Sequence, residues 1–166
     1  MKITKKGDGG ETSIGSGRVS KSSDTIIALG EIDHLTSMIG VLMKDLESQE
    51  GKQNSSYLEM SYHLTDIQKD LYHIMCDVAG WSRKIYLEIS RVDFIDSMIC
   101  DSSEKIEIKE FQTCQSYNCY ENLCRTQTRK VECMLHKIDF NNKDLIYRYI
   151  NRLSSYFFAL GLNRLK

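Results

Sequence analysis

The sequence predicts an all-α protein, a five-helix bundle with a glycine-rich N-terminal nucleotide-binding loop. Three observations support this fold class. Apolar residues recur at alternating spacings of three and four residues over much of the chain, which is typical of helices that pack through one face. The 166 residues include no proline, the commonest helix breaker. The apolar segments are joined mainly by short polar stretches, as they are in helical bundles.

The five helices are expected in order along the chain. The first begins near Asp24, a good N-cap residue. The polar stretch 47–56 is expected to be a loop, and residues 105–112 alternate in a way that favours an extended segment. The other helices are expected over Tyr57–Val78, over Lys84–Cys100, around Leu123–Leu135, and after a cap at Asn141 or Asn142.

Length and charge point to one soluble domain over residues 1–166. The chain is 41% hydrophobic and 27% charged, with a formal net charge of −1. A nearly neutral chain is not expected to bind nucleic acid or an acidic membrane non-specifically. No uninterrupted apolar run approaches the ~20 residues that span a bilayer, and the first residues lack the apolar core of a signal peptide. We therefore expect a cytoplasmic protein with no membrane partner.

The six cysteines include no CxxC pair. Neither a zinc site nor a thioredoxin-type redox motif is indicated, and no resident metal site is expected. Three of the cysteines recur every five residues, at Cys114, Cys119 and Cys124, which distributes them around a helix. Their default interpretation is as small buried side chains in a reducing compartment.

Residues 1–23 are polar and hold half of the ten glycines. Glycine lets backbone N–H groups approach an anion closely, and lysines and hydroxyls can complete a phosphate cradle. The segment supplies such groups at Lys5, Lys6, Thr12, Ser13 and Lys21. The Walker A spacing GxxxxGK[ST] is absent. A disordered Ser/Gly-rich tail is the alternative interpretation.

The stretch LCRTQTRKVECML places Arg125 and Arg129 four residues apart, with Glu132 three residues further along. On a helix these side chains share one face, where two planar guanidiniums suit a phosphate group. A solvated helix face is the alternative. Asp33 and Asn151 likewise adjoin apolar seams, and polar residues beside several seams of a bundle favour a site between helices or at a subunit interface.

Six segments occur together in a recognisable order: TKKGDGGETS, GRVSK, GEIDHL, IQKDLY, CRTQTRKVE and YINRLSSYFFAL. Together they resemble the ATP:cob(I)alamin adenosyltransferases of the trimeric helical-bundle type, over nearly the whole chain. The resemblance implies transfer of the 5′-deoxyadenosyl group of ATP to cob(I)alamin, which gives adenosylcobalamin and releases triphosphate. It also implies a homotrimer with active sites between subunits, and ATP bound with Mg²⁺.

The resemblance further implies roles for individual residues. Asp33, Arg125 and Arg129 would be catalytic, with Asp33 paired to Arg125 across the interface. Phe111 would contact the corrin as an apolar wedge. The residues implied in ATP binding are Thr4, Lys5, Lys6, Gly7, Thr12, Ser13, Lys21, Arg129, Lys130, Glu132 and Asn151.

The chain departs from the family pattern mainly on the corrin side. FQTCQSYN stands where a proline–glycine turn is usual after Phe111, Cys133 where an arginine is common, and Ser155 where an aspartate is common. The implied protein partners are a cobalamin reductase and an adenosylcobalamin-dependent client enzyme. A non-catalytic ATP-binding or adenosylcobalamin carrier protein of the same fold is the alternative function, and an unrelated structural bundle is a third.

Overall fold

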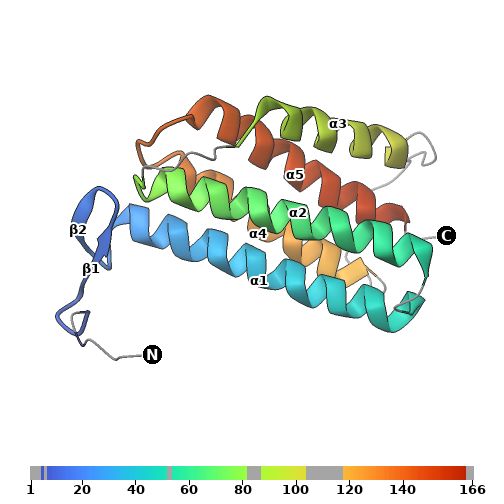
Figure 1. Cartoon of the computed structure of the whole chain (residues 1–166), viewed down its shortest axis with the longest axis horizontal. Helices are drawn as coiled ribbons and strands as arrows, with labels where there is room; N and C mark the ends of the chain where they lie inside the picture. Colours follow the sequence, from blue (N-terminus) through green and yellow to red (C-terminus); the bar gives the residue numbers. More distant parts are fainter. Residues whose placement is uncertain (1–4, 6, 52–53, 82–86, 104–117, 164–166) are drawn as a thin grey trace.

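The computed structural model of the chain describes residues 5, 7–51, 54–81, 87–103 and 118–163. It confirms the predicted all-α class. Figure 1 shows the helices lying side by side along one long axis, with a small β-hairpin beside one end of the bundle. The five helices are α1 (Asp24–Glu50), α2 (Ser55–Val78), α3 (Ile89–Ser103), α4 (Cys119–Leu135) and α5 (Lys143–Asn163).

The hairpin lies inside the segment that was expected to be a glycine-rich loop or tail. β1 (Glu11–Ile14) pairs antiparallel with β2 (Gly17–Ser20), and Ile14 lies opposite Gly17 at the closed end. Gly17 has a φ of 126°, a backbone conformation that favours glycine. The segment before the helices is therefore partly ordered by a two-stranded sheet, which was not predicted from the sequence.

The first two helices differ from the prediction at their ends. Ser23, not Asp24, is the N-cap of α1, because its Oγ accepts a hydrogen bond from the backbone N–H of Ile26 at 3.4 Å. Asp24 instead lies in the first turn, where a negative charge suits the helix dipole. At the other end α1 runs through Glu50, and Asn54 caps α2 so that the helix begins at Ser55. The predicted loop 47–56 is therefore shorter than expected.

The remaining helix ends show one clear error. α3 begins at Ile89, and Leu87 and Glu88 lie before it in non-helical structure, so the prediction of a helix from Lys84 was wrong over these two residues. The residue Lys84 itself and the extended segment expected at 105–112 lie outside the described residues. Asn142 has a φ of 58° and its carbonyl accepts from the N–H of Ile146 at 3.1 Å, so the chain enters α5 as predicted.

The apolar seams of the helices meet in one core. α4 packs against both α1 and α5, α2 packs against α1, and α3 packs against α5. Because α4 lies between α1 and α5, its two sides face different helices. The fully buried core side chains include Ile32, Leu35, Ile39, Leu42, Leu64, Ile67, Leu71, Ile74, Val131, Ile146, Ile150, Leu153 and Phe157.

A buried polar network joins three of the helices. Asp70 of α2 accepts a hydrogen bond from the Tyr149 hydroxyl of α5 at 2.7 Å. The same carboxylate forms an ion pair with Arg91 of α3, with 2.7 Å between Nη2 and Oδ2. Burial and the neighbouring Asp70 raise the pKa of Tyr149, so its hydroxyl stays protonated and keeps donating.

α1 is the most apolar of the long helices by mean hydropathy over an 18-residue window. An 18-residue window within residues 24–49 has a mean hydropathy of 1.5, so α1 is long and apolar enough to cross a membrane by length and composition alone, although only 28% of that window is buried within the chain. The core stripe is covered, whereas Ile27 and Val41 are 39% and 50% exposed. One face of α1 thus fills the core, and its outer face carries two exposed apolar side chains, Ile27 and Val41, among polar ones such as His34 and Lys44.

Candidate functional site

The N-terminal cluster is built around Lys21, which follows β2. Its ammonium group donates to the carbonyl of Gly7 at 2.6 Å, and its backbone N–H donates to the carbonyl of Gly10 at 2.9 Å. These bonds fasten the turn at 7–10 to the base of the hairpin. Lys5 is exposed beside that turn, and its carbonyl accepts from the N–H of Asp8 at 3.2 Å. Three predicted ATP-binding residues are therefore neighbours at this end of the bundle.

The tip of the hairpin docks on the C-terminal end of α2. The N–H of Ser16 donates to the carbonyl of Ala79 at 3.2 Å. A Cβ atom added to Gly15 would lie 2.3 Å from both the carbonyl oxygen of Gly80 and Cδ1 of Trp81. Only a glycine allows this approach, so Gly15 fixes where the hairpin sits relative to the helices.

Docking the hairpin creates a cavity of about 470 Å³ between the hairpin, α1 and α2. It brings together three residues that the sequence pointed to separately, the hydroxyls of Thr12 and Ser13 and the carboxylate of Asp33. The other walls are largely apolar and aromatic. This combination can hold a flat apolar ring while a few polar groups fix its orientation. The remaining lining residues are Ile14, Ile26, Leu29, Gly30, Tyr72, Met75, Ala79 and Trp81.

A second cluster lies between α4 and α5. Arg125 and Arg129 line one cavity of about 260 Å³ together with Ser154, Ser155 and Phe158. Their i, i+4 spacing on α4 places both guanidiniums toward α5. Two guanidiniums beside two serines can bind a multiply charged anion such as a phosphate chain. In the sequence Ser155 stood out only as a departure from the family pattern, and Ser154 and Phe158 were not singled out.

Glu132 and Asn151 lie at the same α4–α5 boundary. The amide of Asn151 donates to Glu132 Oε1 at 3.2 Å, and Arg152 donates to the amide oxygen of Asn151 at 3.2 Å. Arg152 also pairs with Asp96 of α3 at 2.7 Å. These contacts link Glu132 and Asn151, two residues that the resemblance implied in ATP binding, to each other and to α3 through Arg152.

Lys130 lies on a different side of α4. Its ammonium is 2.7 Å from Glu31 Oε1 of α1, and Gln127 donates to Oε2 of the same carboxylate at 2.7 Å. Hydrogen bonds from Lys130 and then from Gln127 lower the pKa of Glu31. Lys130 therefore faces α1, although the resemblance grouped it with Arg129 in ATP binding. Its i, i+3 relation to Gln127 was the sequence signal for this second contact face.

Asp33 and Arg125 are held on different parts of one chain. Asp33 lines the cavity beside the hairpin and α2, whereas Arg125 lines the cavity between α4 and α5 and its Nε donates to Asn122 Oδ1 at 3.3 Å. Among the described contacts, the predicted pair is not formed within a single copy. Phe111, Thr4 and Lys6 lie outside the described residues.

The cysteines only partly match the expectation of small buried side chains. Cys76 and Cys124 are buried, and burial raises the pKa of the Cys124 thiol to about 12, so it is not a nucleophile at neutral pH. Cys100 and Cys133 are exposed, because each lies on the outer side of its helix. Within the described ranges, no three histidine, cysteine or acidic side chains gather as a metal-binding group.

The decisive comparison is with known families. The family model described as cobalamin adenosyltransferase matches residues 2–163. The chain belongs to this family. It is also 33% identical over 167 residues to the corrinoid adenosyltransferase of Bacillus subtilis (strain 168), across 96% of the chain and 84% of that protein. The cobalamin adenosyltransferase of Cupriavidus metallidurans is 28% identical, across 97% of the chain and 87% of that protein.

Solved structures of the family have the same fold. A variant PduO-type adenosyltransferase from Lactobacillus reuteri, complexed with ATP, matches with a TM-score of 0.78 and 26% identity over 96% of the chain and 91% of its own. Another variant of that type, complexed with cobalamin and ATP, matches with a TM-score of 0.80 and 23% identity over 97% and 89%. As a member of this cobalamin adenosyltransferase family, the chain is an ATP:corrinoid adenosyltransferase. None of these comparisons favours the non-catalytic carrier.

Proposed function

We propose that the chain transfers the 5′-deoxyadenosyl group of ATP to cob(I)alamin in active sites that two copies of the chain complete together. The observation that carries this proposal is the separation of its two polar clusters. Thr12, Ser13 and Asp33 line a cavity beside the hairpin, whereas Arg125 and Arg129 line a cavity between α4 and α5. A second copy can bring one cluster against the other, as the implied Asp33–Arg125 pair requires.

In this reaction the cobalt of cob(I)alamin is the nucleophile. Its electron pair forms a bond to C5′ of the ribose, the C5′–O bond breaks, and its electrons leave with triphosphate. The protein has to align C5′ with cobalt and stabilise the charge on the leaving group. Cobalt changes formally from Co(I) to Co(III), and no other oxidant or reductant enters this step.

The N-terminal cluster is the nucleotide half of the site. In the proposal, Lys5, Lys6 and Lys21 lie near the phosphates with Thr4 and Gly7, while Thr12 and Ser13 hydrogen-bond the nucleotide. Figure 1 supports a site shared between copies, because the chain at residues 7–10 extends away from its own bundle. A segment placed in this way can reach the helices of a neighbouring copy.

The helix cluster is the leaving-group half. Arg129 would bind the triphosphate, and Arg125 would be oriented by Asp33 of a second copy. Glu132 and Asn151 are already hydrogen-bonded to each other beside this groove and would contact the nucleotide. Mg²⁺ would enter with ATP and be held mainly by phosphate oxygens and water. Phe111 keeps its predicted role against the corrin ring.

Among the residues implied in ATP binding, Lys130 has a side chain that is already ion-paired with another helix. Its ammonium already pairs with Glu31, so contact with a phosphate requires that this bond break or that Lys130 act through its charge alone. The lysine end of this ion pair is exposed whereas Glu31 is half-buried, and Gln127 also donates to Glu31, so the carboxylate keeps one partner if Lys130 turns to a phosphate. Lys130 therefore stays in the proposal as a secondary contact.

The assembly proposed is a cytoplasmic homotrimer. Its support is the family resemblance, together with two apolar side chains of α1, Ile27 and Val41, that are exposed in a single copy and that a neighbouring copy would cover. The protein partners proposed are a reductase that supplies the corrinoid as Co(I) and an enzyme that uses adenosylcobalamin.

Mixing two inactive variants tests the shared site. Asp33→Asn and Arg129→Ala are expected to be inactive alone. If Asp33 and Arg129 in one site come from different copies, unfolding the two variants together and refolding them at equal amounts will restore about a quarter of the sites, since random assembly pairs two intact halves with that frequency. The measurement is adenosylcobalamin formation with reduced cobalamin and MgATP.

The control for this experiment is refolding each variant alone. Recovery of activity only in the mixture supports a site shared between copies. No recovery, with trimers formed and each variant folded, would show that both residues belong to the same copy and would overturn the shared site while leaving the family's activity untouched.

A further inference from the structure

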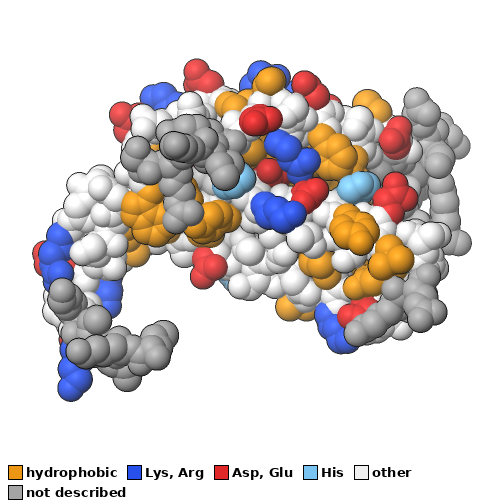
Figure 2. All heavy atoms as spheres, viewed as in Figure 1, with side chains coloured by type: hydrophobic (Ala, Val, Ile, Leu, Met, Phe, Trp, Pro, Cys, Tyr) orange, Lys and Arg blue, Asp and Glu red, His pale blue; other side chains and the backbone are white. Residues whose placement is uncertain are grey.

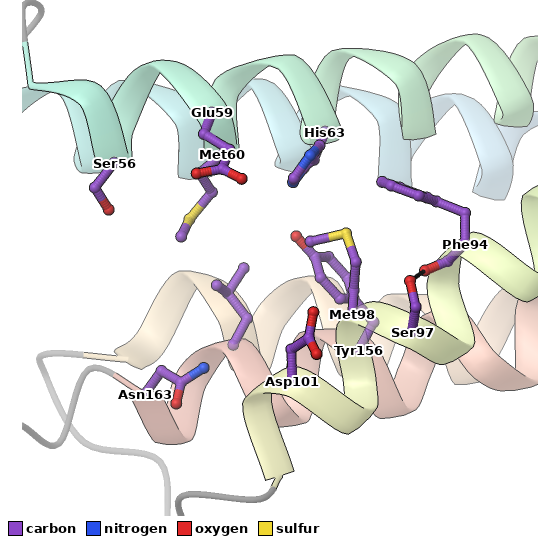
Figure 3. Close-up of a pocket in the computed structure, with 11 residues that line it drawn as sticks. Ser56, Glu59, Met60, His63, Phe94, Ser97, Met98, Asp101, Tyr156 and Asn163 are labelled. Carbon is purple, nitrogen blue, oxygen red and sulfur yellow. Dashed lines mark hydrogen bonds between the residues drawn. The ribbon is translucent and has the colours of Figure 1, made fainter.

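A separate cavity of about 380 Å³ lies between α2, α3 and α5 (Figure 3). It is distinct from the cavity that Arg125 and Arg129 line. The two cavities are lined by different side chains of α5, and α4 contributes no described residue to this one. Its lining includes Glu59, Met60, Met98, Asp101, Tyr156 and Leu160.

The floor of this cavity holds a buried hydroxyl that lacks a hydrogen bond. Tyr156 is only 1% exposed, and its hydroxyl has no hydrogen-bond partner among the described residues. Figure 3 shows the phenol pointing from α5 toward the space between α2 and α3. Buried polar groups are normally hydrogen-bonded, so an unpartnered hydroxyl facing a cavity is open to a hydrogen bond with a molecule bound there.

The mouth of the cavity is acidic. Glu59 comes from α2 and Asp101 from α3, and both carboxylates are exposed. The described lining includes no lysine or arginine, and His63 is the one basic side chain in it. Figure 2 shows acidic and hydrophobic side chains gathered between α2 and α3 at this end of the molecule. The mouth therefore attracts a cation and repels anions such as ATP or triphosphate.

Apolar side chains lie between the acidic mouth and the buried hydroxyl. Met60 of α2, Met98 of α3 and Leu160 of α5 line this part, and methionine adapts its shape to a bound hydrocarbon. The volume of 380 Å³ lies at the low end for small-molecule sites. A ligand that fits all three zones is short, cationic at one end, aliphatic in the middle and polar but uncharged at the other end.

We propose that this cavity binds a short aliphatic amino alcohol. The ammonium group would lie between Glu59 and Asp101, the methylene chain against Met60 and Met98, and the hydroxyl would hydrogen-bond to Tyr156. A diamine fits less well, because its second ammonium would lose its hydration beside the buried end of the cavity. The site is independent of the proposed adenosyl-transfer site and uses none of its residues.

Calorimetry with four matched compounds tests the ligand class. 4-Amino-1-butanol is expected to bind the folded wild-type protein about threefold to tenfold more tightly than n-butylamine, which lacks the hydroxyl. 1-Butanol and 4-hydroxybutyrate are expected not to bind, and the affinity for the amino alcohol should fall as salt is added. Absence of binding by the amino alcohol at about 10 mM would overturn the proposal.

Two sets of variants test the residues. Tyr156→Phe should abolish the preference for 4-amino-1-butanol over n-butylamine while leaving n-butylamine binding unchanged. Glu59→Gln combined with Asp101→Asn should weaken both amines by about tenfold and reduce their salt dependence. The control for Tyr156→Phe is Tyr62→Phe, since Tyr62 is 71% exposed. The control for the acidic pair is Asp93→Asn on α3.

The variants distinguish a built site from non-specific attraction. A preference for the amino alcohol that persists in Tyr156→Phe would overturn the role of the buried hydroxyl. Equal losses in Asp93→Asn and in the Glu59 and Asp101 variants would show that the amines bind the acidic surface generally, which also overturns the proposal.

Discussion

Asp70 is the residue through which α2, α3 and α5 are tied together. Its carboxylate is 5% exposed and contacts both Arg91 and the hydroxyl of Tyr149. A buried carboxylate is stabilising only while its partners stay in place, because each partner left alone keeps its desolvation cost. The three groups therefore act as one unit.

Removing the shared carboxylate should be far worse than removing one hydroxyl. Asp70→Ala leaves a cation and a buried hydroxyl without their partner, and we expect a loss of about 3 kcal/mol in the free energy of unfolding. Tyr149→Phe keeps the ion pair and should cost about 1 kcal/mol. Urea denaturation of the two variants measures both values, and equal losses would contradict a network centred on Asp70.

At the residue scale, the sequence predicted which residues share a helix face better than it predicted which side chains contact each other. The i, i+4 spacing correctly placed Arg125 and Arg129 on one side of α4. Lys130 is one position further along the helix, about 100° around the axis, and therefore faces α1. The resemblance implied that Lys130 is a site residue but did not say toward which helix its side chain points. Its pairing with Glu31 depends on how α1 and α4 pack, and no local sequence pattern specifies that packing.

At the scale of elements, the hairpin depends on one close backbone approach. Gly15→Ala would place a methyl group against the carbonyl of Gly80, where no flexible side chain can move aside. We expect the hairpin to shift from its dock, the emission of the single tryptophan, Trp81, to change, and ATP affinity to fall by about tenfold. The helices should melt within about 2 °C of the wild type.

Gly9→Ala is the matched control for this variant, because a Cβ atom at Gly9 would have no neighbour within 4 Å. Fluorescence and calorimetric ATP titration of both variants give the comparison. Unchanged ATP affinity in Gly15→Ala, together with a changed tryptophan spectrum, would contradict the role of the docked hairpin in nucleotide binding.

Asp77 destabilises the last turn of α2. It is 5% exposed, lies at the negative end of the helix dipole, and burial raises its pKa above the ordinary value. The folded state therefore holds this proton more tightly than the unfolded state, and the stability contribution of Asp77 decreases as pH rises from the unfolded pKa through the folded one.

The isosteric variant isolates this effect. Asp77→Asn should increase the free energy of unfolding at pH 7 by about 0.5–1 kcal/mol, and the gain should shrink as the pH falls toward about 4. The amide oxygen can still accept the 3.4 Å hydrogen bond from Asn142. Denaturation curves over this pH range measure the difference, and a gain that grows on acidification would contradict a raised pKa for Asp77 in the folded state.

The elements themselves were largely predictable, and their ends were not. Heptad-like spacing predicted the helices because burial of one face dominates their stability. The choice of Ser23 over Asp24 as a cap depends on a single hydrogen bond. The hairpin had a readable signal, since Gly15 and Ser16 are a pair typical of a two-residue hairpin turn and separate two short runs with β-branched residues, ETSI and GRVS. Its glycines were instead interpreted as a phosphate cradle.

At the scale of the whole molecule, the outer face of α1 exposes apolar side chains that no other described element of the same copy covers. Val41 is 50% exposed and lies beside Gly40 and Ser37 in a shallow cavity reached by Tyr120 of α4. Lys44, Asp45 and Ser48 line the same cavity, so this face combines small, apolar and charged side chains that a second copy could contact. The proposed trimer gives this face a function.

A charge on this face should separate the copies. Val41→Glu is expected to reduce the mass measured by light scattering to that of one 19.2 kDa chain, while the helical circular dichroism is kept. Adenosyl transfer should then fall by at least about tenfold, because half of each site is lost. Tyr62→Glu on α2 is the control, and a Val41→Glu variant that keeps the wild-type mass would contradict the use of this face.

The sequence predicted the fold class and singled out Asp33, Arg125 and Arg129. It did not single out Ser154 or Phe158. The resemblance implied a pair between Asp33 and Arg125 across an interface, whereas no local pattern showed that the two residues line different cavities in one copy. Their separation depends on the packing in which α4 lies between α1 and α5. The cavity around Tyr156 was equally hidden, since its lining comes from three helices and its residues belong to none of the motifs.

The most direct test of the proposed function is an anaerobic turnover assay with chemically reduced cobalamin and MgATP, followed by the visible spectrum of adenosylcobalamin. The wild-type protein should form product only when ATP is present. Arg129→Ala should fold normally and lose turnover by at least about a hundredfold, because it removes a guanidinium that stabilises the triphosphate leaving group. ATP binding by the wild type without product would contradict the transferase mechanism, and full activity in Arg129→Ala would contradict the placement of the phosphates in the α4–α5 groove.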